Sequence, residues 1–162
     1  MKGIESAITS NYEESKDFNP DRARGTCQWV LKNHKYACWR QAKKDDLLWI
    51  SADPGCGKSV LARSLIDHEF QNLTMNTTCY FFFKDDNENQ DNLASALCAI
   101  LHQLFSKQPQ LIKYAIPSWD QNGSNLRVEV RELWKILLSA TASKDANPGA
   151  LSFSCSGQRR ER

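Results

Sequence analysis

The sequence lacks the features that mark several common functional classes. Its six cysteines form no C-x-x-C pair, and its three histidines show no zinc-ligand spacing. No apolar run approaches the length of a membrane span, and the first residues have no apolar core of signal-peptide length. A formal net charge of +2 gives no electrostatic reason to expect nucleic-acid or membrane binding. We therefore expect a cytoplasmic protein with reduced thiols.

The remaining composition, 41% hydrophobic and 25% charged, is that of an ordinary globular protein, and 162 residues suit one domain. Residues 1–22 are polar and are predicted to be a flexible N-terminal lead-in. Residues 23–142 contain the apolar patterning of the domain. Residues 143–162 are rich in Ser, Ala, Gly and Asn and are predicted to be an atypical, disordered tail, in which only 150–155 would suit a strand.

Apolar spacing predicts an alternation of strands and helices. The short apolar runs 47–51 and 79–83 are typical of parallel strands covered on both faces. Helices are predicted where apolar residues recur at intervals of three and four, in 58–66, 91–105 and 130–138. Shorter helices are predicted at 26–31, with Thr26 as its cap, at 36–39 and at 111–116. The predicted fold class is therefore α/β, with a small parallel sheet and flanking helices.

Between the first predicted strand and the next helix lies a match to the phosphate-binding pattern G-x-x-x-x-G-K-[ST]. With the residue that follows, the matching residues are Ala52, Asp53, Pro54, Gly55, Cys56, Gly57, Lys58, Ser59 and Val60. Gly55 and Gly57 let backbone N–H groups turn inward around a phosphate. Lys58 would reach the β- and γ-phosphates, and the Ser59 hydroxyl would bind Mg²⁺.

Ala52 stands where the pattern has glycine, at a cost of at most about 1 kcal/mol. A glycine-rich turn formed for packing alone is the alternative. The flanking strand and helix favour a phosphate loop.

Several motifs follow in an order known from one family: "GTCQWV", "LLWISADPGCGKSVLARSLID", "TCYFFFKDDNENQDN", "ALCAILHQLF", "PSWDQNGSNL" and "ELWKILL". Over residues 19–140 the chain resembles the nephrocystin-3-like N-terminal domain, the NACHT-type P-loop module of fungal STAND proteins. That resemblance implies a partial P-loop NTPase fold and a nucleotide-dependent switch. Such a module binds ATP or GTP with Mg²⁺, oligomerises, and precedes repeats that sense a ligand. It would place residues 25–29 beside the base, although packing of Trp29 and Trp39 against the sheet is the simpler interpretation.

The resemblance also implies an acidic Walker B element that this sequence does not supply. In the family, a strand ending in acidic residues follows "ELWKILL" and holds Mg²⁺ through water. Here no acid follows 151–155 until Glu161, and Asp145 precedes that segment. Hydrolysis is therefore doubtful, because phosphoryl transfer depends on the metal site.

No other acid or base fills this gap convincingly. Asp85 and Asp86 follow the second predicted strand at the sheet edge where ligands bind, but their polar surroundings indicate a solvated loop. His102 is interpreted as an ordinary boundary residue of a helix. By the same resemblance, later strands separate the first two in the complete sheet. Either these two pair directly here, or 151–155 enters the gap.

Three functional interpretations follow from the sequence. The first is nucleoside triphosphate binding by a switch module, with nucleotide as partner and with self-association or association with full-length relatives. The second is an interaction fragment without nucleotide function. The third is a truncated, non-functional chain that does not fold stably, because an unpaired strand exposes backbone polar groups.

Overall fold

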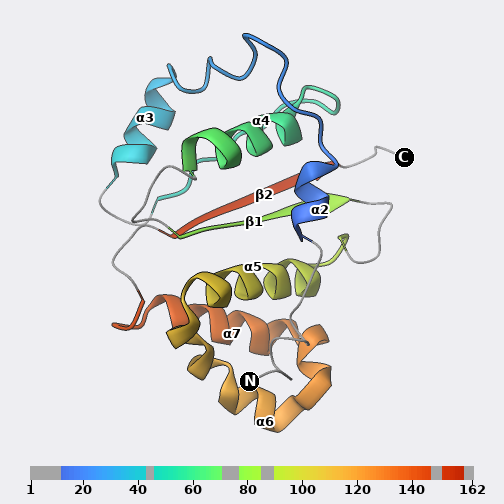
Figure 1. Cartoon of the computed structure of the whole chain (residues 1–162), viewed down its shortest axis with the longest axis vertical. Coiled ribbons are helices and arrows are strands. Elements are labelled where there is room, and N and C mark those ends of the chain that lie inside the picture. Colours follow the sequence, from blue (N-terminus) through green and yellow to red (C-terminus); the bar gives the residue numbers. More distant parts are fainter. Residues whose placement is uncertain (1–11, 43–45, 71–76, 85–89, 147–150, 159–162) are drawn as a thin grey trace.

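The computed structural model describes residues 12–42, 46–70, 77–84, 90–146 and 151–158 (Figure 1). Its α-helices are α2 (Tyr12–Asp17), α3 (His34–Gln41), α4 (Lys58–Leu65), α5 (Leu93–Lys107), α6 (Ile116–Asn122) and α7 (Val130–Thr141). The helical turns of other types are a π-helix η1 (Ile66–Phe70) and the 3₁₀ segments η2 (Pro109–Tyr114) and η3 (Gly123–Val128). The strands are β1 (Thr77–Lys84) and β2 (Leu151–Gln158). The described part of the chain is thus mixed and mostly helical.

The two strands pair in parallel, in a register that runs from Thr77 opposite Leu151 to Lys84 opposite Gln158. In Figure 1 the helices α3 and α4 lie on one side of this pair, and α5, α7 and α6 lie on the other. Both faces of β1 are therefore covered by helices. Coverage on both faces explains why a continuous apolar run, rather than an alternating one, forms this strand.

The side chains of β1 divide between the two layers, because successive residues of a strand point to opposite faces. Tyr80 and Phe82 pack with α4, η1 and the buried Tyr36 of α3. Cys79 packs in the larger cluster. That cluster is built from buried residues of α5, η2, η3 and α7: Leu97, Cys98, Ile100, Leu101, Leu104, Phe105, Leu111, Ile112, Leu126, Leu133, Ile136, Leu137 and Ala140.

The strand predicted at 47–51 is not formed, and this expectation was wrong. Leu48 and Ile50 pack partly buried against the α4 cluster, whereas Leu47 and Trp49 are 81% and 79% exposed. The side chains thus alternate as in a strand, but no described segment pairs with this backbone. A strand needs a hydrogen-bonded neighbour, and among the described residues β2 pairs with β1. Direct pairing of the first two predicted strands is therefore not observed.

Other local predictions also need correction. The segment 26–31 forms turns rather than a helix, because the Thr26 hydroxyl donates to the Ala23 carbonyl (2.7 Å) and Cys27 has a φ of 63°. In the two terminal segments, α2 lies within 1–22 and β2 lies within 143–162. The helices predicted around 36–39, 58–66, 91–105 and 130–138 are confirmed as α3, α4, α5 and α7. The predicted helix at 111–116 overlaps η2 and the start of α6.

Candidate functional site

The predicted phosphate loop joins the 46–51 segment to α4. In Figure 1, α4 runs opposite to the strands, so its first residue lies toward the carboxyl ends of β1 and β2. Ligands of open α/β sheets bind at this edge. Residues 52–57 are all exposed, and Lys58, Ser59 and Val60 are partly buried. The loop is thus open to a ligand from solvent.

Gly55 and Gly57 give the loop its shape. Their φ angles are 79° and 76°, in the left-handed region that side chains rarely adopt. A Cβ at either position would meet no atom within 4 Å, so the backbone conformation, and not crowding, requires glycine here. Gly57 is the N-cap of α4, so no N-cap side chain forms a hydrogen bond with the first amides of this helix. The first amides of a helix have no partner within the helix and carry its positive dipole end, so they are suited to bind an anion.

Lys58 reaches back across the loop to its first residues. Its Nζ donates to the carbonyl oxygens of Ala52 (2.7 Å) and Asp53 (2.9 Å). The loop is further closed by the Cys56 amide, which donates to the Asp53 carbonyl at 3.3 Å. The ammonium group of Lys58 is therefore held over the loop formed by residues 52–57, where it would meet a bound phosphate.

Among the other candidate residues that the structure describes, none is brought to this loop. Asp85, Asp86 and Glu161 lie outside the described residues. Asp145 follows α7, where it accepts from the Tyr114 hydroxyl (2.7 Å) and pairs with Lys113 (2.8 Å). The hydrogen bond from Lys113, and then that from Tyr114, lower the pKa of Asp145. This acid therefore belongs to a surface contact between η2 and the end of α7.

His102 is also placed away from the loop, on the α5 face toward β1 and α2. Its ring lies 5.8 Å from that of Tyr12, and its Nδ1 is buried without a hydrogen-bond partner. Within the described ranges, no cluster of three or more His, Cys, Asp or Glu residues could hold a metal ion.

The tryptophans near the N-terminus behave differently from one another. Trp39 is partly buried and packs against Phe70, with ring centroids 6.1 Å apart, as the packing interpretation expects. Trp29 is exposed. Packing on the domain is therefore confirmed for Trp39, and the placement of residues 25–29 beside a base stays a prediction.

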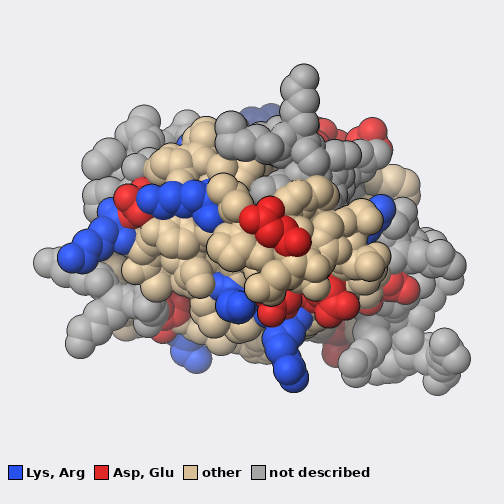
Figure 2. Space-filling view, turned by 90° about the horizontal axis from the view of Figure 1, so that it is seen from below, with Lys and Arg blue, Asp and Glu red and all other residues tan. Residues whose placement is uncertain are grey.

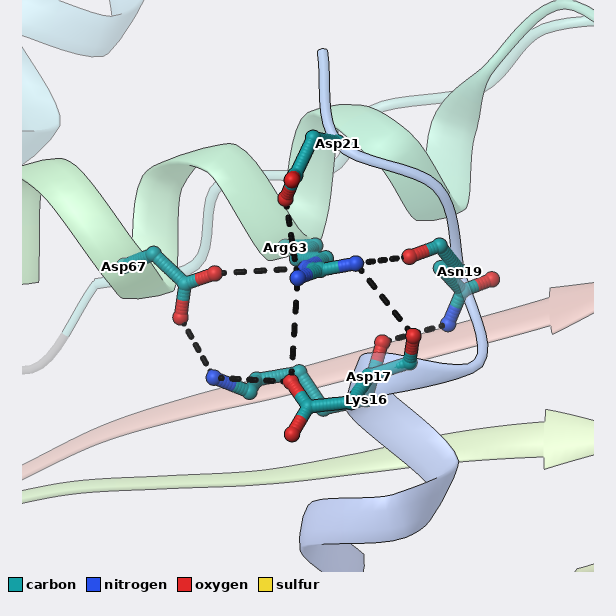
Figure 3. Close-up of polar contacts among 6 residues, drawn as sticks. All are labelled: Lys16, Asp17, Asn19, Asp21, Arg63 and Asp67. Carbon is teal, nitrogen blue, oxygen red and sulfur yellow. Dashed lines mark hydrogen bonds and ion pairs between the residues drawn. The ribbon is translucent and has the colours of Figure 1, made fainter.

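One polar cluster was missed by the sequence reasoning, and it connects residues 16–21 to α4 and η1 (Figure 3). Arg63 pairs with Asp21 (2.8 Å) and Asp67 (3.3 Å) and donates to the backbone carbonyls of Asp17 and Asn19. Lys16 pairs with Asp67 at 2.6 Å. Burial lowers the pKa of Lys16, but its contacts with Asp67 outweigh this effect and raise it. Residues 16–21 are thus fastened to α4, the helix that follows the predicted phosphate loop.

The face in Figure 2 is mostly uncharged and carries scattered side chains of both signs. Among the helices of the described residues, none combines the length and apolar character needed to cross a membrane.

Comparison with known proteins supports the resemblance drawn from the motifs. Residues 25–153 match the family model described as Nephrocystin 3, N-terminal. Over 121 residues the chain is 29% identical to the vegetative incompatibility protein HET-E-1 of Podospora anserina. This aligned region covers 75% of the present chain and 9% of HET-E-1. The match thus spans only a small part of its relative, and no solved structure matches the chain. Because the family model covers well over half of the sequence, the chain belongs to the nephrocystin-3 N-terminal family.

Proposed function

We propose that the chain binds a nucleoside triphosphate, ATP or GTP, through residues 52–60, as a partial P-loop NTPase fold. The observation that supports this best is the double hydrogen bond from Lys58 to the carbonyls of Ala52 and Asp53. It holds a cation above a loop whose two glycines have left-handed φ angles. The negative charge of a triphosphate tail would pair with that cation, and its oxygens would accept hydrogen bonds from the first amides of α4.

Mg²⁺ would enter with the nucleotide. Magnesium is usually bound by one or two protein oxygens together with phosphate oxygens and several waters. The Ser59 hydroxyl on the first turn of α4 fits this role, and it does not require a preformed cage of carboxylates. We propose little or no hydrolysis by this chain, since no described acid lies where a Walker B carboxylate would act.

Thermal unfolding with and without nucleotide tests the proposal. A ligand that binds only the folded state at about 100 times its Kd stabilises it by about 2.7 kcal/mol. For a domain of this size the melting temperature should rise by about 5–10 °C. Lys58→Ala should abolish the shift. An equal shift in parent and variant would contradict the proposed loop.

A matched pair of glycine variants separates backbone strain from binding. Gly57 and Gly123 both have positive φ angles, and an added Cβ would meet no atom within 4 Å at either position. Replacing Gly57, which is in the left-handed helical region, by alanine should cost about 1–2 kcal/mol in the free energy of unfolding. Gly123→Ala should cost about 1–3 kcal/mol, because the ψ of Gly123 is −135° and lies outside that region. Only Gly57→Ala should also remove the nucleotide-induced shift. Loss of the shift in both variants would mean that destabilisation, not the loop, governs binding.

A second candidate function is association with another copy or with a full-length relative through the uncovered side of residues 47–51. Leu47 and Trp49 favour it, because two large apolar side chains are exposed side by side on one face of this segment. Sedimentation velocity of the parent and of the double variant Leu47→Ser/Trp49→Ser tests it. A parent that stays monomeric at high concentration would exclude self-association by this route.

We also propose a cytoplasmic location. Five cysteines are free thiols, of which Cys38 and Cys56 are exposed and Cys27, Cys79 and Cys98 are not. Exposed free thiols persist in reducing compartments.

A further inference from the structure

Helix α7 carries an apolar stripe on its outer face. Val130, Trp134 and Leu138 are 38%, 50% and 51% exposed. They are spaced four residues apart, so in a helix of 3.6 residues per turn they lie within about 80° of one another. The adjoining face of the same helix is buried in the core through Leu133 and Leu137, which lie about 100° and 60° around the helix from Trp134. The core fixes this helix, and the stripe is held as a rigid ridge.

A basic flank borders the stripe on one side. Arg131 and Lys135 are exposed and lie about 60° and 100° around the helix from Trp134. Arg127, in η3, is exposed one turn earlier. The other flank is closed by the buried leucines. The surface therefore consists of an apolar ridge with positive charge on its only open side.

The nearest carboxylate does not neutralise this flank fully. Glu132 lies on the far side of α7, where it accepts from the Ser118 hydroxyl at 2.8 Å. It also pairs with Lys135 at 3.4 Å, but this contact is solvent-exposed and so contributes little. No ion pair to Arg131 or Arg127 occurs among the described residues. Two positive charges beside the ridge thus remain for a partner.

From this arrangement we propose that the α7 ridge, formed by Val130, Trp134 and Leu138, docks an amphipathic helix with an acidic flank. A row of side chains four residues apart is the ridge that packs into the groove of another helix. Tryptophan at its centre is a residue type that often dominates binding energy at interfaces. Acidic residues on the partner would meet Arg131 and Lys135, and this complementarity would set orientation and speed association.

The charges disfavour a second copy of this chain as the occupant. In an antiparallel pair of α7 helices the same flank of each copy would face its counterpart, so Arg131 would approach Lys135 of the other copy. Like charges in this position oppose pairing. A parallel pair would need the flank that Leu133 and Leu137 bury in the core. A membrane surface is also a poor fit, because only three apolar residues protrude from a helix fixed on the domain.

The test uses the full chain and two labelled synthetic helical peptides, each about three heptads long. Both have leucines at the apolar positions, and their flanking positions are all Glu in one peptide and all Lys in the other. By fluorescence anisotropy we expect saturable binding of the Glu peptide, weakened by added salt, and at least about tenfold weaker binding of the Lys peptide. Equal binding of the two peptides, or binding of neither, would overturn the proposal.

Three variants locate the binding surface. Trp134→Ala should weaken binding of the Glu peptide about tenfold or more, whereas Trp29→Ala, which removes another exposed indole, should not change it. Arg131→Glu/Lys135→Glu should reverse the preference toward the Lys peptide. All these side chains are exposed, and circular dichroism checks that each variant folds. Unchanged affinity in the charge-reversed variant refutes the acidic partner.

Two other outcomes would assign the ridge to another occupant and so overturn the proposal. One is a parent dimer, seen by sedimentation, that Trp134→Ala dissociates. The other is co-sedimentation with phosphatidylserine vesicles that depends on Trp134 while neither peptide binds.

Discussion

Gln103 makes the connection between α5 and β1 that is easiest to test. Its side chain is 1% exposed. Its Oε1 accepts from the Tyr80 amide at 3.1 Å, and its Nε2 donates to the Tyr80 carbonyl at 2.8 Å and to the Ala99 carbonyl at 3.0 Å. A single amide side chain thus satisfies both backbone groups of one strand residue. In effect it takes the place of a neighbouring strand.

Gln103→Leu keeps the approximate volume and removes these bonds. A buried polar group left without a partner costs about 1–3 kcal/mol, and Tyr80 would have two such groups. Burying leucine instead of an amide offsets part of this cost, so we expect a net loss of about 3 kcal/mol in the free energy of unfolding. At this chain length that corresponds to a melting temperature lower by about 6–12 °C.

Differential scanning calorimetry and urea denaturation measure the loss. Gln121→Leu is the matched control, because Gln121 is an exposed glutamine of α6 and its replacement should change stability by less than about 0.5 kcal/mol. If Gln103→Leu melts within a degree or so of the parent, the side chain does not support the edge of β1. The packing of α5 on the strand would then need another explanation.

Three further outcomes are expected. Arg63→Ala should cost about 2 kcal/mol, because it leaves nearby carboxylates without their partner, and hydrogen exchange should quicken over residues 12–21. Cys56 is exposed and should react with iodoacetamide quickly unless nucleotide protects it, whereas burial raises the pKa of Cys79 to about 12 and should keep it unreactive in the folded protein. The hydrogen bond from the Ser118 hydroxyl has the largest effect on the pKa of Glu132 and lowers it from 4.5, and Lys135 lowers it further. Ser118→Ala should therefore lose stability at neutral pH. That difference should vanish in acid unfolding curves as the pH falls through the lowered pKa and Glu132 is protonated in both proteins.

The sequence predicted what short-range patterns determine. The helices α5 and α7 follow from apolar residues at intervals of three and four, and β1 follows from a continuous apolar run. The glycine-rich turn before α4 follows from a spacing in which two glycines must take positive φ, as Gly55 and Gly57 do. These are properties of neighbouring residues, so one sequence is enough to find them.

The failures arise where distant residues decide. Residues 47–51 have the composition and alternation of a strand, but a strand also needs a paired neighbour, and the sequence did not reveal which segments pair. The cluster around Arg63 was missed because its partners are far apart along the chain, with Lys16 and Asp67 separated by 51 residues. Only the Arg63 and Asp67 pair, four residues apart on one helical face, gave a local signal.

The central claim is that residues 52–60 bind a triphosphate tail. Isothermal titration calorimetry with ATP and with GTP, each with Mg²⁺, measures this binding directly on the parent protein and on Lys58→Ala. The account predicts saturable heat at about one site per chain for at least one nucleotide, and binding at least about tenfold weaker in the variant. A folded parent that shows no binding of either nucleotide, or a variant that binds as tightly as the parent, would contradict it.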